Sequence, residues 1–553
     1  MVRITFYGGV DEVGGNKILL ESQTTRLMLD FGRRMGFDSQ FFAEFLEPRT
    51  ATTLKDRITI GALPRIDGVY RQDLIAPVGL DGVDNGAYAR LLTSDSAYLR
   101  LEGIESYEEI KRKEGRGRLD AILLSHAHLD HTGDIMFLHT DIPLYCSRET
   151  ETLVEVIDEV TSFRSEAIST TQNEISIASK GCTPRAPQPS RDKKDLRRTT
   201  HAMTDGEATK IGDFNVRLIQ VDHSVPGAAS LVLEIDGRKL LYTGDIRFHG
   251  THPMKIDDYI QKTGGGIDIM ICEGTRIDSH SVMTEELVKE KISQKVAQTK
   301  GLVFVDFSWK DTTRYETVKQ VAIDKKRTFV INARLAYILH RLGIYPREEE
   351  PVRVFLKRKG TALYSPADYN KQKHEYGLST DWKEPPIDDT HYKNGLTAQQ
   401  IMENPGKYIL MLSFFDLGQI FDLADSDGKI PDSWFIRAQC EPFSDEMEID
   451  EERMINWLDR FRIGYDLGET RLPNGCKNAS CEKLRPRMDR SHVSGHASRP
   501  ELLELISKLK PRVLMPVHTP NAHSFVSLAD DVEKSTGHRM KLILPELDKT
   551  YDI

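Results

Sequence analysis

The sequence has little cysteine, no long apolar run and no excess of positive charge. Its 6 cysteines are scattered over 553 residues without a Cys-x-x-Cys pair, which excludes a disulfide scaffold and favours a reduced, cytoplasmic chain. Cys476 and Cys481 form only a loose pair, which is typical of loop residues rather than zinc ligands. No run of about 18 apolar residues occurs, and the strand-like residues 2–6 stand where a basic and apolar leader would be, so we expect neither a membrane span nor secretion.

The overall charge is acidic. Lys and Arg number 75, Asp and Glu 85, and the net charge is −10. This balance argues against a protein that coats polyanions, so any nucleic-acid contact must come from local basic surface. The length predicts two or three domains at roughly 100–200 residues each.

The most informative stretch is residues 125–131, Ser-His-Ala-His-Leu-Asp-His, directly after the apolar strand predicted at 119–124. His126 and His128 point the same way from an extended segment, whereas Asp130 and His131 lie at the turn into the next helix. Imidazole and carboxylate ligands suit zinc, with manganese or iron as weaker alternatives. The stretch therefore predicts a metal site with room for a second ion.

Two later strand ends supply further ligands. Strands are predicted at 214–221, 231–235 and 240–245, with a hairpin turn at Asp236-Gly237. His223 follows the first of them, and Asp245 ends the last as the candidate bridging ligand. Asp30 also ends an apolar strand, where it either supports a ligand histidine from behind or caps a turn.

The combined pattern resembles a known family. His126-x-His128-x-Asp130-His131, His223 and Thr243-Gly244-Asp245 are similar to the ligand series of the metallo-β-lactamase fold. Three later motifs resemble the extra motifs of the β-CASP nucleases, and most of all those of ribonuclease J. These motifs are Glu273 at the end of a strand, His-Val-Ser-Gly-His-Ala-Ser at 492–498, and Pro516-Val517-His518.

The resemblance implies an α/β fold, namely a metallo-β-lactamase αββα sandwich with an inserted doubly wound β-CASP domain. The expected units are 1–274, with an insertion at about 33–118, then the β-CASP domain at 275–485, and the end of the sandwich at 486–553. The middle of the chain suits this, with strands predicted at 301–307, 328–331, 408–412 and 434–437 and a helix at 333–342. Residues 133–139 are predicted to begin a helix, residues 345–400 to form a loop-rich insertion, and residues 180–200, which include Arg198, a mobile basic loop. Only a short tail follows His518, so we expect the separate carboxy-terminal domain of ribonuclease J to be absent.

The resemblance also implies roles for individual residues. One zinc ion would be held by His126, His128 and His223, the other by Asp130, His131 and His518, with Asp245 as the bridge. The catalytic set would be Asp130, Glu273 and His496: Glu273 orients His496, which either donates to a phosphate oxygen or protonates the leaving 3′-oxygen. The Ser-x-x-Glu pattern at 498–501 predicts the start of a helix, and a helix amino terminus favours phosphate. Candidate phosphate-binding residues are His492, Ser494, Gly495, Ala497 and Ser498.

The expected function is a metal-dependent ribonuclease that hydrolyses single-stranded RNA, from the 5′ end, internally or both, with a hydroxide activated by two zinc ions, or by manganese in their place. A DNA nuclease of the same fold is the first alternative, because the metal chemistry is the same. A small-molecule metallo-hydrolase is the second, although it would not need Glu273, His496 or the inserted domain. The resemblance also allows a homodimer.

Overall fold

The computed structural model describes residues 2–43, 46–49, 52–76, 100–161, 165–172, 175–176, 179–180, 183–184, 188–189, 195–251, 254–280, 283–347, 349–357, 395–442, 445–468 and 487–553. Cys476 and Cys481, most of the basic loop and the middle of the 345–400 segment lie outside these residues. None of the helices described combines the length and apolar character that a bilayer crossing needs.

Two seven-stranded mixed sheets carry the two ends of the chain. The first has the order β12 (Thr200–Met203), β5 (Leu144–Ser147), β4 (Ala121–Leu123), β3 (Arg26–Leu29), β2 (Lys17–Glu21), β1 (Arg3–Gly8) and β27 (Thr550–Asp552). The second has the order β13 (Ala208–Ile211), β14 (Phe214–Gln220), β15 (Ala229–Ile235), β16 (Arg238–Tyr242), β17 (Ile269–Glu273), β25 (Val513–Val517) and β26 (Lys541–Leu542). Each sheet therefore unites strands from distant parts of the sequence.

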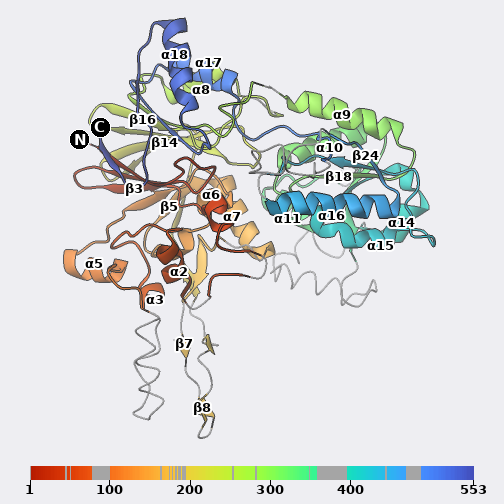
Figure 1. Ribbon diagram of the computed structural model, residues 1–553, viewed down its shortest axis with the longest axis horizontal. Coiled ribbons are helices and arrows are strands. Elements are labelled where there is room, and N and C mark those ends of the chain that lie inside the picture. The colour runs from red at the N-terminus through yellow and green to blue at the C-terminus, as the bar shows by residue number, and fades with distance from the viewer. Residues whose placement is uncertain are drawn as a thin grey trace, which may run out of the picture.

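The alternation of side chains shows how these sheets pack. Ile18 and Leu20 of β2 join Leu231 and Leu233 of β15 in one core between the sheets, because successive residues of a strand face opposite ways. Leu19 faces outward into a second core. That core is covered by α2 (Thr53–Ile60), α3 (Gln72–Ile75), α5 (Tyr107–Glu114) and α7 (Arg148–Val160). The outer face of the second sheet is covered by α8 (Ile256–Thr263), α17 (Arg499–Leu509) and α18 (Ser524–Thr536), which gather at the opposite end in Figure 1. The layers are thus helix, sheet, sheet, helix.

A third seven-stranded sheet holds the middle of the chain. Its order is β21 (Leu396–Thr397), β20 (Val352–Leu356), β19 (Thr328–Ile331), β22 (Tyr408–Met411), β18 (Val303–Asp306), β23 (Trp434–Arg437) and β24 (Gly464–Tyr465). All its neighbouring strands run parallel. Val303 and Val305 face one core and Phe304 faces the other. One face is covered by α9 (Glu285–Gln298), α10 (Thr312–Asp324) and α11 (Ala333–Arg341), the other by α14 (Ala398–Glu403), α15 (Ile420–Leu423) and α16 (Asp445–Phe461). This is a doubly wound domain beside the sandwich (Figure 1).

The remaining elements are short. They are α1 (Met35–Asp38), α6 (Leu129–Thr132), the 3₁₀ turns η2 (Ile135–Phe137), η4 (Pro405–Lys407) and η5 (Phe414–Gln419), and the strands β6 (Ser169–Thr171), β7 (Ile175–Ser176), β8 (Ser179–Lys180), β9 (Thr183–Pro184), β10 (Gln188–Pro189) and β11 (Asp195–Arg197).

The predicted fold class is confirmed, and three local predictions are wrong. Residues 133–139 contain only the three-residue 3₁₀ turn η2 at 135–137 rather than the start of a helix. Within the segment predicted as a loop-rich insertion, residues 352–356 form β20, whose apolar residues pack against the third sheet's helices. Arg198 is not solvated: it is 2% exposed and donates hydrogen bonds to main-chain carbonyls, among them those of Ala167 and Ile142, at 2.8 and 2.6 Å. Burial of both segments depends on partners far away in the sequence, which a local pattern does not reveal.

Candidate metal centre

The candidate ligands all lie just beyond strand ends. β4 leads into the 126–131 stretch, β14 precedes His223, β16 precedes Asp245 and β25 precedes His518. In the second sheet, β14, β15, β16, β17 and β25 are successive neighbours, so the residues that follow these strands can meet on one side of the sandwich. The fold therefore brings together the side chains that the sequence separates by up to about four hundred residues.

The predicted ligands fall into two adjoining groups. His126, His128, His223 and Asp245 form one, and Asp130, His131 and His518 form the other. Asp245 lies between them: its Oδ2 is 3.5 Å from Nε2 of His126 and 3.4 Å from Nε2 of His131, and its Oδ1 is 3.3 Å from Nδ1 of His518. A third group of possible ligands shares Asp245 and His518 with these two and adds His496.

The spacing and chemistry of these atoms fit metal ions. A tetrahedral ion with ligands at about 2.1 Å has ligand–ligand edges of about 3.4 Å, close to the distances from Asp245. Several ligand atoms are buried without a hydrogen-bond partner, namely Nε2 of His131, both ring nitrogens of His518 and Oδ1 of Asp245. Such atoms are costly to bury unless something binds them. The types of side chain, their spacing and their unpartnered atoms are therefore those of a metal-binding site.

The pKa values of the histidines also fit a metal site. Burial lowers the pKa of His126, His128, His223 and His518 well below the usual value, so these rings are neutral, the form that binds a metal. Burial also lowers the pKa of His131, but the Asp245 and Asp30 carboxylates outweigh it and raise that pKa. A cation bound among these groups would displace the proton from His131.

Asp30 lies behind the ligands, as one of its two predicted roles requires. Nδ1 of His131 donates to Oδ2 of Asp30 at 2.7 Å, which leaves Nε2 facing the site. The carboxylate also accepts from the main-chain N–H and the hydroxyl of Ser125, at 2.7 and 2.8 Å, and from the hydroxyl of Tyr242 at 2.6 Å. Asp30 has a positive φ of 54°, a conformation that most side chains avoid and that these four bonds hold in place.

Glu273 and His496 lie beside the ligand groups. Oε2 of Glu273 is 3.4 Å from Nδ1 of His496, and Oδ2 of Asp245 is 3.9 Å from the same nitrogen. Burial lowers the pKa of His496, but Glu273 and Asp245 outweigh this and raise it to about 9. The ring of His496 is 18% exposed, so one side of it remains open to a substrate.

The candidate phosphate-binding residues use most of their polar groups within the protein. The N–H of Ala497 donates to Oε1 of Glu273 at 3.2 Å. The N–H and hydroxyl of Ser498 donate to Oε2 of Glu501 at 2.8 and 2.7 Å, which gives α17 the predicted capping box. The carbonyl of Gly495 accepts from Nδ1 of His223 at 2.6 Å. His492 lies against the carbonyl of Ala438, and among the described contacts none joins it to the ligand groups.

Sequence reasoning missed three residues near the centre. Lys310 lies in the loop between β18 and α10, half-buried, with no ion pair among the described residues. Burial lowers the pKa of Lys310, which the Asp130 carboxylate partly offsets, and the Lys310 charge helps to lower the pKa of His128 after burial and His223. Arg247 and His249 follow Asp245 and contact the 494–501 segment. Their proximity to Asp245 was a usable signal, whereas nothing local distinguishes Lys310 from other lysines.

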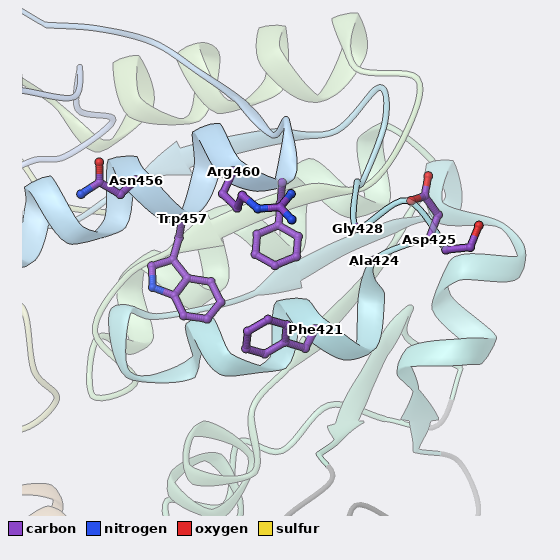
Figure 2. Close-up of a pocket in the computed structure, with 9 residues that line it drawn as sticks. Phe421, Ala424, Asp425, Gly428, Asn456, Trp457 and Arg460 are labelled. Carbon is purple, nitrogen blue, oxygen red and sulfur yellow. The ribbon is translucent and has the colours of Figure 1, made fainter.

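A hollow lies away from the metal centre, on the doubly wound domain. It has a volume of about 530 Å³ and lies between α15 and α16, with Phe421, Trp457 and Phe461 as its aromatic walls and Arg460 and Asp425 at its sides (Figure 2). None of its lining residues belongs to the ligand groups.

Comparison with known proteins agrees with this geometry. Residues 105–301 match the β-lactamase superfamily domain, and residues 483–541 match the RNA specificity domain of Zn-dependent metallo-hydrolases. The chain therefore contains a metallo-β-lactamase domain and an RNA specificity domain. It is similar to several proteins named ribonuclease J.

Individual relatives show how far the similarity extends. The chain is 21% identical to ribonuclease J of Pyrococcus abyssi, over 94% of this chain and 90% of that one. It is 30% identical to the probable RNase MJ4 of Methanocaldococcus jannaschii, over 28% of this chain and 34% of the relative. The match to ribonuclease J of Corynebacterium glutamicum covers 27% of that protein, so the chain spans only about a third of the length of these two relatives. A crystal structure of a protein of unknown function from Enterococcus faecalis V583 covers all of both chains with a TM-score of 0.63 at 18% identity, which supports the fold alone.

Proposed function

We propose that the chain is a metal-dependent ribonuclease that hydrolyses phosphodiester bonds of single-stranded RNA. The observation that carries this proposal is the convergence of seven metal-ligand side chains beside the Glu273–His496 pair. The matches to an RNA specificity domain and to ribonucleases support RNA as the substrate.

We propose two zinc ions as the cofactor, with manganese as the alternative. His126, His128 and His223 would hold one, Asp130, His131 and His518 the other, and Asp245 would contact both. When bound, the ions supply an activated water and positive charge next to the reacting phosphate. The protein's contribution is to hold neutral imidazoles at fixed spacing and to orient His131 through Asp30.

His496 is the proposed proton donor at the reacting phosphate. Despite burial, Glu273 and Asp245 raise its pKa, which favours the protonated ring, and Nδ1 lies within ion-pair distance of Glu273, so Nε2 is the proposed donor. Lys310 is proposed to contact a phosphate oxygen from the side of the doubly wound domain, since it is half-buried without a carboxylate within ion-pair distance among the described residues. His492 and Ser494 remain candidates for the flanking phosphates.

The proposed organisation follows the sheets. Residues 1–274 and 486–553 would form the metal-binding sandwich, and residues 275–485 would form the domain that contacts RNA from the other side. We propose that the protein acts in the cytoplasm.

The test compares one single-stranded sequence as RNA and as DNA, after metal analysis of protein purified without chelators. Hydrolysis of RNA, loss of it in Asp245→Asn, and its retention in His538→Ala are expected. His538 is the matched control because its Nε2 donates to the carbonyl of Pro511 at 2.8 Å, outside the ligand groups. Cleavage of DNA at a higher rate than RNA would favour the DNA nuclease, and hydrolysis of neither would overturn the proposal.

A further inference from the structure

One buried guanidinium joins three segments that surround the metal centre. Arg247 is 1% exposed. Its Nε donates to Oδ1 of Asp222 at 3.0 Å, its Nη1 to the carbonyl of Ser494 at 3.4 Å, and its Nη2 to the hydroxyl of Thr313 at 3.1 Å.

Each of these contacts adjoins a functional residue or element. Asp222 directly precedes His223, Ser494 lies two residues before His496, and Thr313 lies in the first turn of α10. Arg247 itself follows Asp245 by two residues. A single side chain thus links a ligand strand end, the His496 loop and the doubly wound domain.

His249 strengthens the hold on the same loop. Its Nε2 lies 3.1 Å from the carbonyl oxygen of Ser494, and its Nδ1 lies 2.7 Å from Oε1 of Glu501, so the ring contacts both the His496 loop and the first turn of α17. The other carboxylate oxygen of Glu501 accepts from Ser498. The loop that carries His496 is therefore fixed on both sides of that residue.

We propose that Arg247 is a positioning residue that sets His496 against the metal ligands and makes this setting depend on the doubly wound domain through Thr313. This inference rests on the proposed function, because the rate of phosphodiester hydrolysis is what tests it. The planar guanidinium can satisfy three acceptors at once, whereas a lysine ammonium in its place lacks the fork geometry. Loss of the hydrogen bond from Arg247 to the carbonyl of Ser494 would allow the His496 ring to move. A displacement of about 1 Å at a reacting group lowers the rate about 10²-fold.

A purely structural arginine is available for comparison. Arg198 is equally buried and donates to the main-chain carbonyls of Ala167, Ile142 and Leu138 on the outer side of the first sheet. It shares no hydrogen-bond partner with Arg247. Arg198→Lys therefore reports what loss of a buried guanidinium does to stability alone.

The experiment is a double-mutant cycle between positions 247 and 496. Arg247→Lys should lower kcat about 10²-fold with little change in KM or in metal content. In a His496→Ala background the same change should have almost no further effect, because two residues that act as a unit are not additive. Arg198→Lys should lower the melting temperature and leave kcat and the cycle unaffected. Thr313→Val, which removes only one acceptor, should give a smaller loss of the same kind.

A second readout does not depend on turnover. Amide hydrogen exchange over residues 494–498 should quicken in Arg247→Lys and stay unchanged in Arg198→Lys. If Arg247→Lys lowers kcat by the same factor with and without His496, or leaves the exchange of 494–498 unchanged, the inference is overturned. If the wild type cleaves DNA and not RNA, the proposed function fails, while the cycle measured on DNA still decides the role of Arg247.

Discussion

His496 and His518 have ring centroids 5.3 Å apart, yet their surroundings differ. His518 is fully buried, and neither of its ring nitrogens has a hydrogen-bond partner. It also adopts a positive φ of 50°, held by its N–H donating to the carbonyl of Gly9 and its own carbonyl accepting from Thr275. Nδ1 of His496 also lacks a hydrogen-bond partner, but it lies 3.4 Å from Oε2 of Glu273, and the His496 side chain is 18% exposed. The strained and fully buried His518 therefore suits a metal ligand, and the partly exposed His496 suits proton transfer.

The two histidines should therefore respond differently to alanine. His496→Ala should keep both metal ions and bind RNA nearly normally, while turnover falls about 10²–10⁴-fold, the usual effect of losing a positioned proton donor. His518→Ala should lose metal from one position, and added zinc should partly restore its rate. Metal analysis with single-turnover kinetics separates the two outcomes, and loss of metal from His496→Ala with retention in His518→Ala would show that the roles are reversed.

Lys310 is the second residue whose role can be isolated. If its ammonium contacts a phosphate, Lys310→Met should raise KM for RNA about tenfold, the effect of losing roughly 1.4 kcal/mol of charged hydrogen bonding. Lys310→Arg should restore most of the affinity, because the charge is kept. Lys325→Met, on an exposed lysine at the end of α10, is the matched control and should have no effect. An equal KM for the Lys310 and Lys325 variants would remove Lys310 from the site.

At the scale of elements, the loop at 494–498 does more for the ligands than its sequence suggests. The carbonyl of Gly495 fixes Nδ1 of His223 as a donor, which leaves Nε2 for the metal. A Cβ on Gly495 would lie 2.7 Å from Cε1 of His223, so only glycine allows this approach. The loop thus orients a ligand as well as presenting His496.

Gly495→Ala should for this reason weaken metal binding. The added methyl group would push the His223 ring away from its acceptor, and loss of such a supporting contact costs about 10–100-fold in metal affinity. Gly418→Ala is the control, since a Cβ there meets nothing within 4 Å. Zinc titration in competition with a chromophoric chelator measures both, and equal affinities in the two variants would contradict the role of Gly495.

Strands and ligands were predictable from the sequence for the same physical reason. The apolar alternation in 214–221 and the apolar run in 231–235 indicate burial directly, and His223 and Asp245 stand out as polar residues that follow buried strands. β20 was missed because polar residues surround its five-residue run. Arg247, His249 and Lys310 were missed because each acts through partners that are remote in sequence, which only the folded chain brings near.

For the whole molecule, the metal centre joins the first and last parts of the chain. Ligands from residues 126 to 518 meet at one place, and without ions their buried nitrogens and oxygens lack partners. Metal that binds only the folded state stabilises it by about 2.7 kcal/mol at a hundred times its Kd.

Removal of metal should therefore lower the melting temperature of the protein, and added zinc or manganese should restore it. Asp245→Asn should show a much smaller response, because its carboxylate belongs to one ligand group and lies within 3.4 Å of His131 and His518 in the other. Calorimetry after dialysis against a chelator measures the effect. Identical melting curves with and without metal would mean that the ligand groups do not bind ions in the folded chain.

The contacts between the sandwich and the doubly wound domain lead to a prediction about the substrate. The start of α10 and the loop before it join the doubly wound domain to the sandwich. The hydroxyl of Thr313 accepts from Arg247 and its carbonyl accepts from Thr251 at 3.5 Å, while Trp309 packs against cores of both the sandwich and the third sheet. We therefore expect a substrate phosphate to pass between the two domains to reach His496, which favours a single strand over the wider and stiffer duplex. Unstructured RNA should be cleaved much faster than a blunt duplex of the same sequence, and a duplex with a single-stranded extension should regain cleavage. The comparison needs equal substrate concentrations below KM, and equal rates on the blunt duplex and the single strand would show that the doubly wound domain does not restrict access.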